Sequence, residues 1–403
     1  MEKLKREKVF RDPLLGYIRV FYPVILDLIN TLEFQRLRRI KQLSGVSIVY
    51  HSAEHSRFSH SLGVYELARR VIEEIKSYHE FTQREELLFL SAALLHDLGH
   101  GPYSHTFEII SGIHHEHVTI DIILSKDTEV NKVLNTIDEN FAYDVSQIIN
   151  KTSKDYKLIE NLVSSQLDVD RLDYLRRDSY FTGTYYGEID IERLFRIMQI
   201  HNNRVVFSID GIHTIEDYLL SRYNMYFQVY FHPTARVYEL MLKNIFNRIK
   251  DLFKVNYEFN TDISMVKSLF TNYSVSEYLK LDDFYVNGLI LRFQDEKDEI
   301  LSTLCKDFMN RKLFKKIIVD ESTEDEVNKI LKQYQDLNLD KYYTSFSTVS
   351  QEAYKSESFN LNEILIIDKN NNVKPLEEVS SIVLGLLETS KKTIKIFVYK
   401  DLN

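Results

Sequence analysis

The stretch from Ser91 to His105, SAALLHDLGHGPYSH, constrains the fold more than any other part of the chain. An apolar run from Leu87 to Leu95 leads into the adjacent pair His96 and Asp97, and glycine and proline residues then interrupt the pattern. The run predicts one buried helix at the centre of a helical core. Burying an ionised carboxylate beside an imidazole costs several kcal/mol unless a partner compensates. The helix should therefore end at a site where such a partner is bound.

A divalent cation is the partner that this pair favours, because neutral imidazole and carboxylate together suit the borderline transition metals. His96 and Asp97 supply only two ligands, so others must come from elsewhere in the chain. His100 follows four residues after His96 and lies on the same face if the helix continues. A capped helix end with satisfied polar groups is the alternative interpretation, and a short motif alone does not separate the two.

Composition excludes several classes of protein. The 403 residues exceed one ordinary domain, and 44% hydrophobic with 28% charged residues indicate a globular protein with a large core. No apolar run approaches the ~20 residues that span a bilayer, and no apolar segment of a secretory signal follows Met1. The single cysteine, Cys305, fits a reducing compartment. The net charge of −9 disfavours a broad nucleic-acid-binding surface. We expect a cytoplasmic protein with no membrane partner and no requirement for nucleic acid.

The residue pattern divides the chain into three parts. Residues 1–24 have β-like composition with a glycine break, which predicts an extended or hairpin entry. Residues 25–300 are dominated by helical periodicity, which starts at Val24 with a run to Ile40 and recurs from Tyr218 to Lys250. In residues 301–403, short β-rich runs alternate with helical stretches. The expected fold class is mainly α, a helical core with a small C-terminal α+β appendage.

Two further segments supply candidate ligands. The polar run before His60 reads as a loop entering a helix, so that His60 can reach a metal while Arg57 faces an anion. A single histidine of this kind is more often a capping or core residue. Residues 166–180 place Asp170 among several acidic residues and arginines. Asp170 would complete a site with two imidazoles and two carboxylates, although the segment also fits a salt-bridged surface helix.

Six strings together resemble the HD-domain deoxynucleoside triphosphate triphosphohydrolases. They are KVFRDP (8–13), FQRLRRIKQL (34–43), RFSHSLG (57–63), LHDLGHGPYSH (95–105), HE (115–116) and DVDRLDY (168–174). A bare His-Asp pair would not be specific, but this set is. The resemblance covers residues 8 to 250, implies an HD-domain helical core, and includes no sterile-alpha-motif domain, which suits a bacterial-type member.

The resemblance implies a metal-dependent reaction that splits a dNTP into a deoxynucleoside and inorganic triphosphate, in control of dNTP pools. A divalent ion (Mn, Fe, Zn or Ni) would bind His60, His96, Asp97 and Asp170, with Mg on the nucleotide phosphates. Catalytic roles fall to His100, His105, His115 and Glu116, with His105 favoured as the acid for the 5′-oxygen. Residues matching the triphosphate and catalytic pocket are Arg57, Arg171, Tyr174 and Tyr230. Gln42 and Asp178 match the groups that hold the sugar 3′-hydroxyl, and Leu43 matches the residue packed under the ribose.

The resemblance also implies regulation, because the activated form of the family is a homotetramer with nucleotides at interface sites. The matching positions are Lys8, Arg11, Asn30, Gln35 and Arg38. Asn30 stands where the vertebrate enzyme has a guanine-reading aspartate, and Arg11 where it has an asparagine. The activator expected by resemblance is dGTP or GTP, but these departures leave guanine selectivity open. Pro233 replaces a phosphate-contacting lysine, for which Arg236 is a candidate substitute.

Two other functions fit part of the pattern. An HD phosphodiesterase or pyrophosphohydrolase acting on a signalling nucleotide would share the metal ligands but not the sugar-binding set of Gln42, Leu43 and Asp178. A catalytically inactive HD scaffold would not need the complete quartet of ligands, which makes it the weaker alternative.

Overall fold

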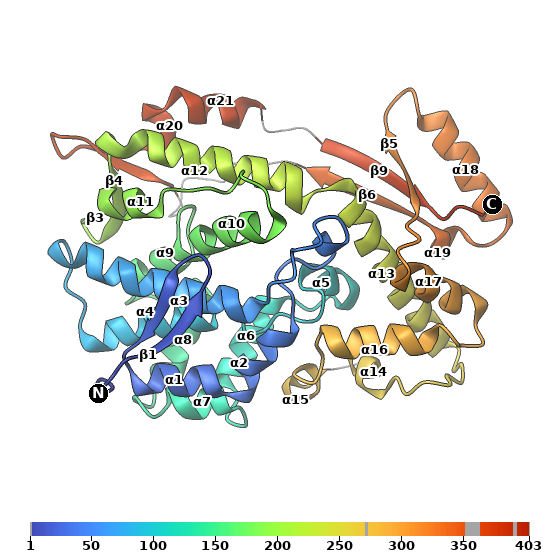
Figure 1. Cartoon of the computed structure of the whole chain (residues 1–403), viewed down its shortest axis with the longest axis horizontal. Helices are drawn as coiled ribbons and strands as arrows, with labels where there is room; N and C mark the ends of the chain where they lie inside the picture. Colours follow the sequence, from blue (N-terminus) through green and yellow to red (C-terminus); the bar gives the residue numbers. More distant parts are fainter. Residues whose placement is uncertain (1, 271–272, 351–362, 390–392, 403) are drawn as a thin grey trace.

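The computed structural model describes residues 2–270, 273–350, 363–389 and 393–402 (Figure 1). Its helices are α1 Pro23–Asn30, α2 Leu32–Arg36, α3 Arg57–Glu74, α4 Gln83–Leu95, α5 His105–Ser111, α6 His115–Leu124, α7 Glu129–Leu134, α8 Phe141–Ile149, α9 Lys157–Val163, α10 Val169–Thr182, α11 Ile191–Ile197, α12 Ile212–Met225, α13 Pro233–Lys254, α14 Ser264–Leu269, α15 Val275–Tyr278, α16 Asp283–Phe293, α17 Glu299–Met309, α18 Glu324–Asp336, α19 Asp340–Tyr343, α20 Leu376–Val379 and α21 Ser381–Thr389. Its strands are β1 Lys8–Asp12, β2 Gly16–Val20, β3 Met198–His201, β4 Arg204–Ser208, β5 Lys315–Val319, β6 Thr344–Ser350, β7 Leu365–Ile367, β8 Val373–Pro375 and β9 Thr393–Tyr399. The fold is mainly α, as the sequence predicts.

Helix α4 lies at the centre of the helical core. A capping box formed by Thr82 and Glu85 begins it, and every residue from Leu87 to Leu95 is buried. The helix packs against α3, α8 and α9, and α3 in turn packs against α10. Because all faces of its second half are apolar, α4 is stable only inside such a bundle. The buried central helix expected from the sequence is confirmed.

The two longest predicted helices are each interrupted. The stretch from Val24 to Ile40 breaks at Thr31, whose ψ of 149° is extended and whose hydroxyl accepts from the Phe34 amide at 3.4 Å as the cap of α2. Between α12 and α13 the chain forms a π-helical segment over Tyr226–Tyr230, and Pro233 then occupies the first turn of α13. A threonine cap and a proline in a first turn both favour a new helix start over continuation.

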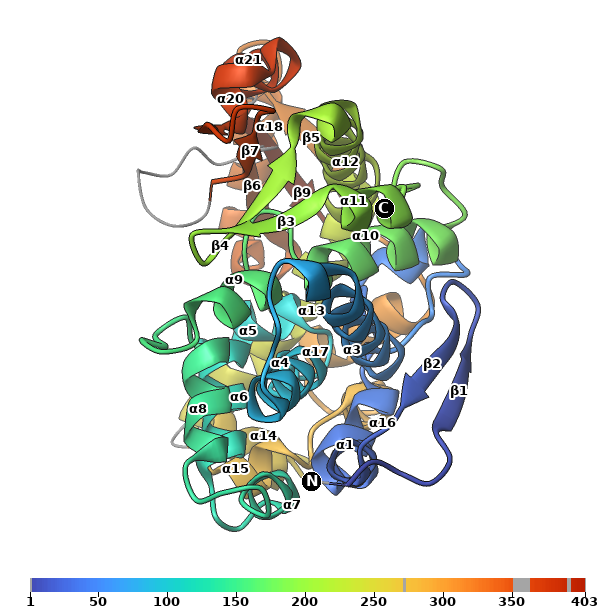
Figure 2. The same ribbon diagram turned by 90° about the vertical axis from the view of Figure 1, so that its left-hand side faces the viewer.

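The predicted N-terminal hairpin is present. Strands β1 and β2 pair antiparallel from Lys8 opposite Val20 to Asp12 opposite Gly16, and the hairpin lies beside α1 and α3 (Figure 2). Asp12 closes its turn, because one carboxylate oxygen accepts from the amides of Leu14 and Leu15, both at 2.9 Å.

The C-terminal strands belong to two sheets. Strands β5, β9 and β6 form an antiparallel sheet beside α18 and α19, whereas β7 and β8 extend a sheet begun by β3 and β4. Strand β7 pairs parallel with β4, through Phe207 opposite Ile366. The sequence did not predict the hairpin Met198–Ser208 inside the helical core. The three-part division of the chain stays a prediction, and residues 351–362, 390–392 and 403 of its third part lie outside the described residues.

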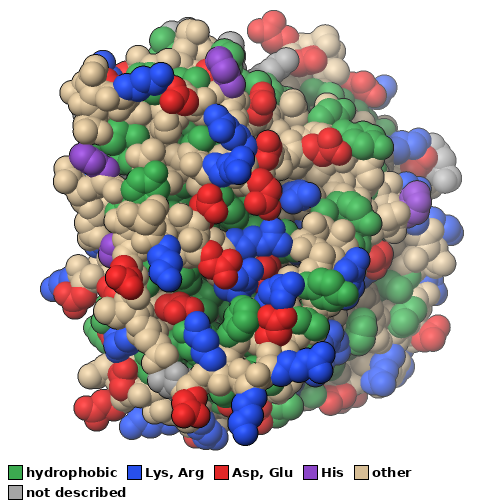
Figure 3. All heavy atoms as spheres, turned by 60° about the vertical axis from the view of Figure 1, so that its left-hand side comes forward, with side chains coloured by type: hydrophobic (Ala, Val, Ile, Leu, Met, Phe, Trp, Pro, Cys, Tyr) green, Lys and Arg blue, Asp and Glu red, His purple; other side chains and the backbone are tan. Residues whose placement is uncertain are grey.

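Among the described helices, none has both the length and the apolar character needed to cross a bilayer. On the face drawn in Figure 3, basic side chains alternate with acidic ones instead of forming one continuous patch.

Candidate metal centre and active site

Three helices bring together side chains that are far apart in the sequence. His60 lies in the first turn of α3, His96 directly follows α4, and Asp170 lies in the first turn of α10. The Nε2 atoms of His60 and His96 lie 3.1 and 3.5 Å from Oδ1 of Asp170. These three side chains form a group able to hold a metal ion.

Asp97 joins the same group. Its Oδ1 lies 3.4 Å from Nε2 of His96, and its Oδ2 lies 3.6 Å from Nε2 of His60. Arg57 also donates to Oδ2 through Nη1, and it donates to the Ser104 hydroxyl through Nε at 2.9 Å. Asp97 therefore connects the group to a buried arginine.

The hydrogen bonds of the two histidines fit a metal ion. Nδ1 of His60 contacts the Asp173 carboxylate at 2.9 Å, and Nδ1 of His96 contacts the Ala93 carbonyl at 2.9 Å. Both partners are acceptors, so each Nδ1 carries the proton and each Nε2 presents its lone pair. Both Nε2 atoms are buried and have no hydrogen-bond partner among the described residues. Two such nitrogens facing two carboxylates are a donor set that suits a divalent transition metal.

The electrostatics of the group favour a positive charge. Burial lowers the pKa of His60, but the adjacent carboxylates of Asp170 and Asp173 outweigh it and raise the pKa to about 10. Burial raises the pKa of Asp170, but His96 and His60 hold it well below the ordinary value. The carboxylates thus favour a second proton on His60, at Nε2. A metal ion would compete with that proton for Nε2.

Asp173 is expected to tune metal affinity without touching the metal. An Asp173→Asn variant should bind Mn²⁺ about 10–100-fold more weakly, because the carboxylate that orients His60 is lost. Isothermal titration of metal-depleted protein measures this affinity. Asp298→Asn is the matched control, because Asp298 pairs with Arg248 at 2.5 Å away from the site. An unchanged affinity in Asp173→Asn, or an equal loss in the control, would contradict the assigned role.

A second histidine group adjoins the first. The rings of His100 and His115 stack with centroids 3.7 Å apart, while Glu108 bonds Nδ1 of His115 and lies 3.4 Å from Nδ1 of His105. Burial, followed by the nearby charges of Arg57 and His115, lowers the pKa of His100 well below its ordinary value. Its Nε2 lies 3.4 Å from Asp97, which connects the two groups.

His100 is not placed by a continuation of the helix beyond His96, the condition under which the sequence put the two histidines on one face. Helix α4 ends at Leu95, so His100 does not follow His96 on one helical face. Instead a turn carries the chain back, with the His100 amide donating to the Asp97 carbonyl at 3.2 Å. Glycines enter this turn because the chain packs closely: a Cβ on Gly99 would overlap the backbone of His115 and Thr119.

Glu116 does not join the histidine group. Its side chain is 56% exposed, and its carboxylate lies 3.6 Å from the Lys151 ammonium. The carboxylate that contacts His105 and His115 belongs to Glu108, which the sequence analysis missed. Its position three residues after His105 in α5 was the available signal, since such residues share a helical face.

A cleft of about 550 Å³ lies over both groups. The residues that line it include the predicted site residues Gln42, Leu43, Arg57, Asp97, His100, His105, His115, Asp170, Tyr174, Asp178 and Tyr230, together with Ser44, Glu108, Arg236 and Glu239. On one wall Tyr230 donates to Oδ2 of Asp178 at 2.8 Å. The Oε1 atom of Gln42 is buried without a hydrogen-bond partner among the described residues. This wall therefore offers polar atoms for a ligand.

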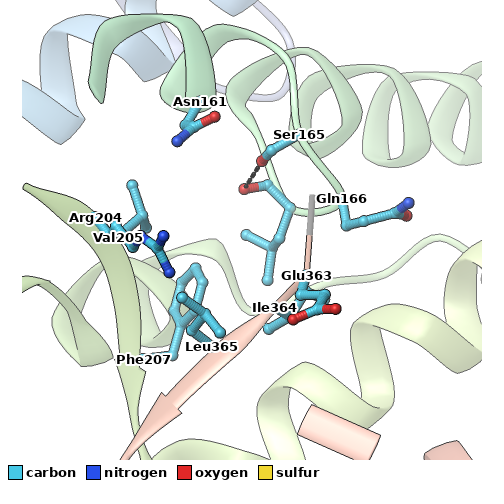
Figure 4. A pocket seen from close by; sticks show the side chains of 10 residues that line it. Asn161, Ser165, Gln166, Arg204, Val205, Phe207, Glu363, Ile364 and Leu365 are labelled. Carbon is cyan, nitrogen blue, oxygen red and sulfur yellow. Dashed lines mark hydrogen bonds between the residues drawn. The ribbon is translucent and has the colours of Figure 1, made fainter. Parts of the chain in front are cut away.

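Arg171 is not among the residues that line the cleft, although it lies next to Tyr174, which does. Its Nε donates to the Ser165 carbonyl at 2.7 Å, and its Nη1 lies 3.5 Å from the Tyr174 hydroxyl. The loop that it holds borders a smaller cavity of about 70 Å³ against β4 and β7, where Figure 4 shows the side chains of Asn161, Gln166 and Arg204. That cavity contains no predicted site residue.

The residues proposed for regulation occupy the surface around α1, α2 and the hairpin. Lys8, Arg11 and Asn30 are exposed. Nε of Arg38 donates to Gln35 at 2.8 Å, and the guanidinium lies 3.5 Å above the Phe58 ring. Arg236, the candidate substitute for the missing lysine, lines the cleft and pairs with Glu239 at 2.7 Å. A nucleotide site here stays a prediction.

Comparison with known proteins finds similarity over nearly the whole chain. The HD domain family matches residues 57–178, and the HD associated region family matches residues 189–402. Among similar sequences, YwfO of Bacillus subtilis is 41% identical over 99% of this chain and 94% of its own length. The Dictyostelium discoideum deoxynucleoside triphosphate triphosphohydrolase SAMHD1 homolog is 30% identical over 79% of this chain and 61% of its own length.

A solved structure is similar over the residues that both family models match. The crystal structure of a phosphohydrolase from Bacteroides thetaiotaomicron superposes with a TM-score of 0.86 at 30% identity, covering 98% of this chain and all of that one. The HD domain match begins at Arg57 and ends at Asp178, so it encloses all four proposed metal ligands. The chain therefore belongs to the HD-domain family that includes the deoxynucleoside triphosphate triphosphohydrolases.

Proposed function

We propose that the chain hydrolyses dNTPs to a deoxynucleoside and inorganic triphosphate with a divalent metal ion held by His60, His96, Asp97 and Asp170. One observation carries the proposal: two buried imidazole nitrogens, without a hydrogen-bond partner in the described part of the chain, face two carboxylates that line a cleft. The same cleft offers Gln42 and Asp178 to a sugar and Arg57 to a phosphate. The relatives named deoxynucleoside triphosphate triphosphohydrolases support this substrate class.

In the proposed hydrolysis, different side chains bind the metal ion, stabilise the phosphates, orient the water and donate the proton. The bound metal ion would polarise a phosphoryl oxygen and lower the pKa of a water molecule. Arg57, fixed by Asp97 and Ser104, stabilises negative charge on the phosphates. His115, held by Glu108, orients the water, and His105, whose side chain is 69% exposed in the cleft, donates a proton to the leaving 5′-oxygen.

The sugar wall of the cleft supports selection of deoxynucleotides. Leu43 lines the cleft beside Gln42, so an apolar side chain meets the face of the ribose. A 2′-hydroxyl placed against it would lose its hydrogen bonds to water and find no replacement. Asp178 accepts the 3′-hydroxyl, which both ribonucleotides and deoxynucleotides carry.

The proposal extends to regulation and cofactors. Mg²⁺ accompanies the phosphates, and Mn, Fe, Zn or Ni occupies the His/Asp site. A homotetramer activated by dGTP or GTP binds the nucleotide near Lys8, Arg11, Asn30, Gln35 and Arg38, and the enzyme acts in the cytoplasm. The hydrogen bond from Arg38 Nε to Gln35 at 2.8 Å supports this site, because it holds the guanidinium in place before a nucleotide binds.

A substrate panel tests the proposed function. Purified protein is incubated with Mn²⁺ or Mg²⁺ and each dNTP, NTP, cyclic nucleotide and pppGpp, with and without GTP or dGTP as activator. We expect inorganic triphosphate to be released from dNTPs, and more of it with activator. Turnover of cyclic nucleotides or pppGpp without dNTP hydrolysis would favour the signalling-nucleotide phosphodiesterase instead. Silence with every substrate and activator would contradict both.

A pair of glutamate variants tests which carboxylate serves the histidines. Glu108→Gln should lower kcat about 10²-fold, because the carboxylate that orients His115 is replaced by an uncharged amide. Glu116→Gln should stay within about twofold, because that carboxylate lies outside the cleft. Steady-state kinetics on the preferred dNTP decides between them. The reverse order of effects would return the catalytic role to Glu116.

A further inference from the structure

A buried histidine outside the metal centre connects the two residues proposed to hold the sugar. His55 lies in the loop before α3, and its side chain is 1% exposed. Its Nε2 lies 2.7 Å from Oδ1 of Asp178, which is itself buried. Its backbone carbonyl accepts from the Gln42 amide at 2.9 Å. One residue therefore contacts both Asp178 and Gln42 from behind the cleft wall.

The surroundings of His55 fix the position of its proton. Nδ1 is buried and has no hydrogen-bond partner among the described residues, so a proton there would be an unsatisfied donor. A proton on Nε2 avoids this cost and is donated to the Asp178 carboxylate. The Phe181 ring stacks on the imidazole, with centroids 4.6 Å apart and planes 16° apart, and this contact holds the ring plane.

Asp178 is thereby held by a donor on each oxygen. His55 donates to Oδ1, and the Tyr230 hydroxyl donates to Oδ2 at 2.8 Å. The donors come from separate segments, the loop before α3 and the π-helical segment after α12. Both carboxylate oxygens are therefore restrained, and because Asp178 lines the cleft, it can accept a further hydrogen bond from a ligand there.

We infer that His55 is a positioning residue that sets recognition of the sugar 3′-hydroxyl, an inference that rests on the proposed dNTP hydrolysis. Without the Nε2 donor, Oδ1 of Asp178 loses its restraint, and the carboxylate that accepts from the 3′-hydroxyl can turn away from its position. The hydrogen bond from the Gln42 amide to the His55 carbonyl fixes the second sugar-binding residue relative to Asp178. A histidine that only filled the core would affect every substrate alike.

The test compares the preferred dNTP with its 2′,3′-dideoxy analogue, which lacks the 3′-hydroxyl. His55→Phe keeps an aromatic ring against Phe181 but removes the donor, whereas His55→Gln keeps an N–H donor. We expect His55→Phe to lower kcat/KM for the dNTP about tenfold, mainly through KM, and that for the dideoxy analogue less than about twofold. His55→Gln should recover the dNTP value to within about threefold.

A double-variant cycle separates positioning from folding. In an Asp178→Asn background, which removes the charged acceptor, His55→Phe should change the ratio of dNTP to dideoxy activity by less than about twofold. Thermal melting verifies that each variant folds, and His55→Met serves as the donor-free variant if the phenylalanine chain does not. An equal loss for both substrates in the donor-free variant would overturn the inference and leave the proposed function standing. A wild-type enzyme that hydrolyses no dNTP would overturn both.

Discussion

A His96→Ala variant is expected to lose its bound metal ion and at least about 10³-fold in dNTP turnover, because a metal site contributes several kcal/mol to the transition state. The Nε2 atom of His96 is one of the two buried nitrogens that face Asp97 and Asp170. Its other ring nitrogen contacts only the Ala93 carbonyl, at 2.9 Å, among the hydrogen bonds described. The fold should therefore survive the substitution.

Metal content by mass spectrometry and steady-state kinetics measure the two losses, and melting of the metal-free proteins measures the fold. Metal-free comparison matters because a bound ion raises the melting temperature of whichever protein holds it. His79→Ala is the control, since His79 lies against Phe81, outside the site. Retained metal and turnover in His96→Ala would remove this residue from the centre.

A Gly63→Ala variant is expected to lose about 3–5 kcal/mol of stability, the cost of disrupting a buried ion pair. Gly63 lies on α3 where α10 crosses it, and a Cβ there would overlap the Asp173 carboxylate and the Arg177 guanidinium. These groups form a double hydrogen bond at 2.7 and 2.8 Å. Arg177 also donates to Asp12 of the hairpin at 2.8 Å. One methyl group thus displaces two buried charges.

The same substitution should weaken the metal centre, because Asp173 also holds Nδ1 of His60. Gly288→Ala in α16 is the matched control: among the described residues, no atom outside the helix's own backbone lies within 4 Å of a Cβ at that position, and alanine should stabilise the helix by about 0.5–1 kcal/mol. Urea unfolding gives both free energies. A Gly63→Ala protein as stable as the wild type would show that the packing of α3 on α10 tolerates a side chain.

The sequence predicted the parts of the fold and site that depend on local pattern. The apolar run from Leu87 to Leu95 specified a buried helix, and the motif around His96 indicated metal chemistry. The strings that resemble the family placed His60 and Asp170 in one group, which spacing alone could not do. Contacts between helices, such as α3 on α10, depend on three-dimensional packing that periodicity does not encode.

The differences between prediction and structure have identifiable causes. Glu116 is adjacent to His115 in the sequence, but successive residues on a helix point in different directions, and Glu108 from another helix fills the position. The break at Thr31 follows from side-chain capping, which overrides a continuous apolar pattern. His55 lies in the polar run before His60, but the sequence pattern indicated no role for it, since only the folded chain brings it to Asp178, more than a hundred positions away.

Anomalous diffraction from crystals grown with Mn²⁺ measures the central feature directly, the meeting of four side chains around one cation. We expect a single strong peak within about 2.0–2.3 Å of Nε2 of His60 and His96 and of the carboxylates of Asp97 and Asp170. Manganese bound elsewhere, or His60 and Asp170 turned away from an empty centre at saturating Mn²⁺, would contradict the metal site and the hydrolase built on it.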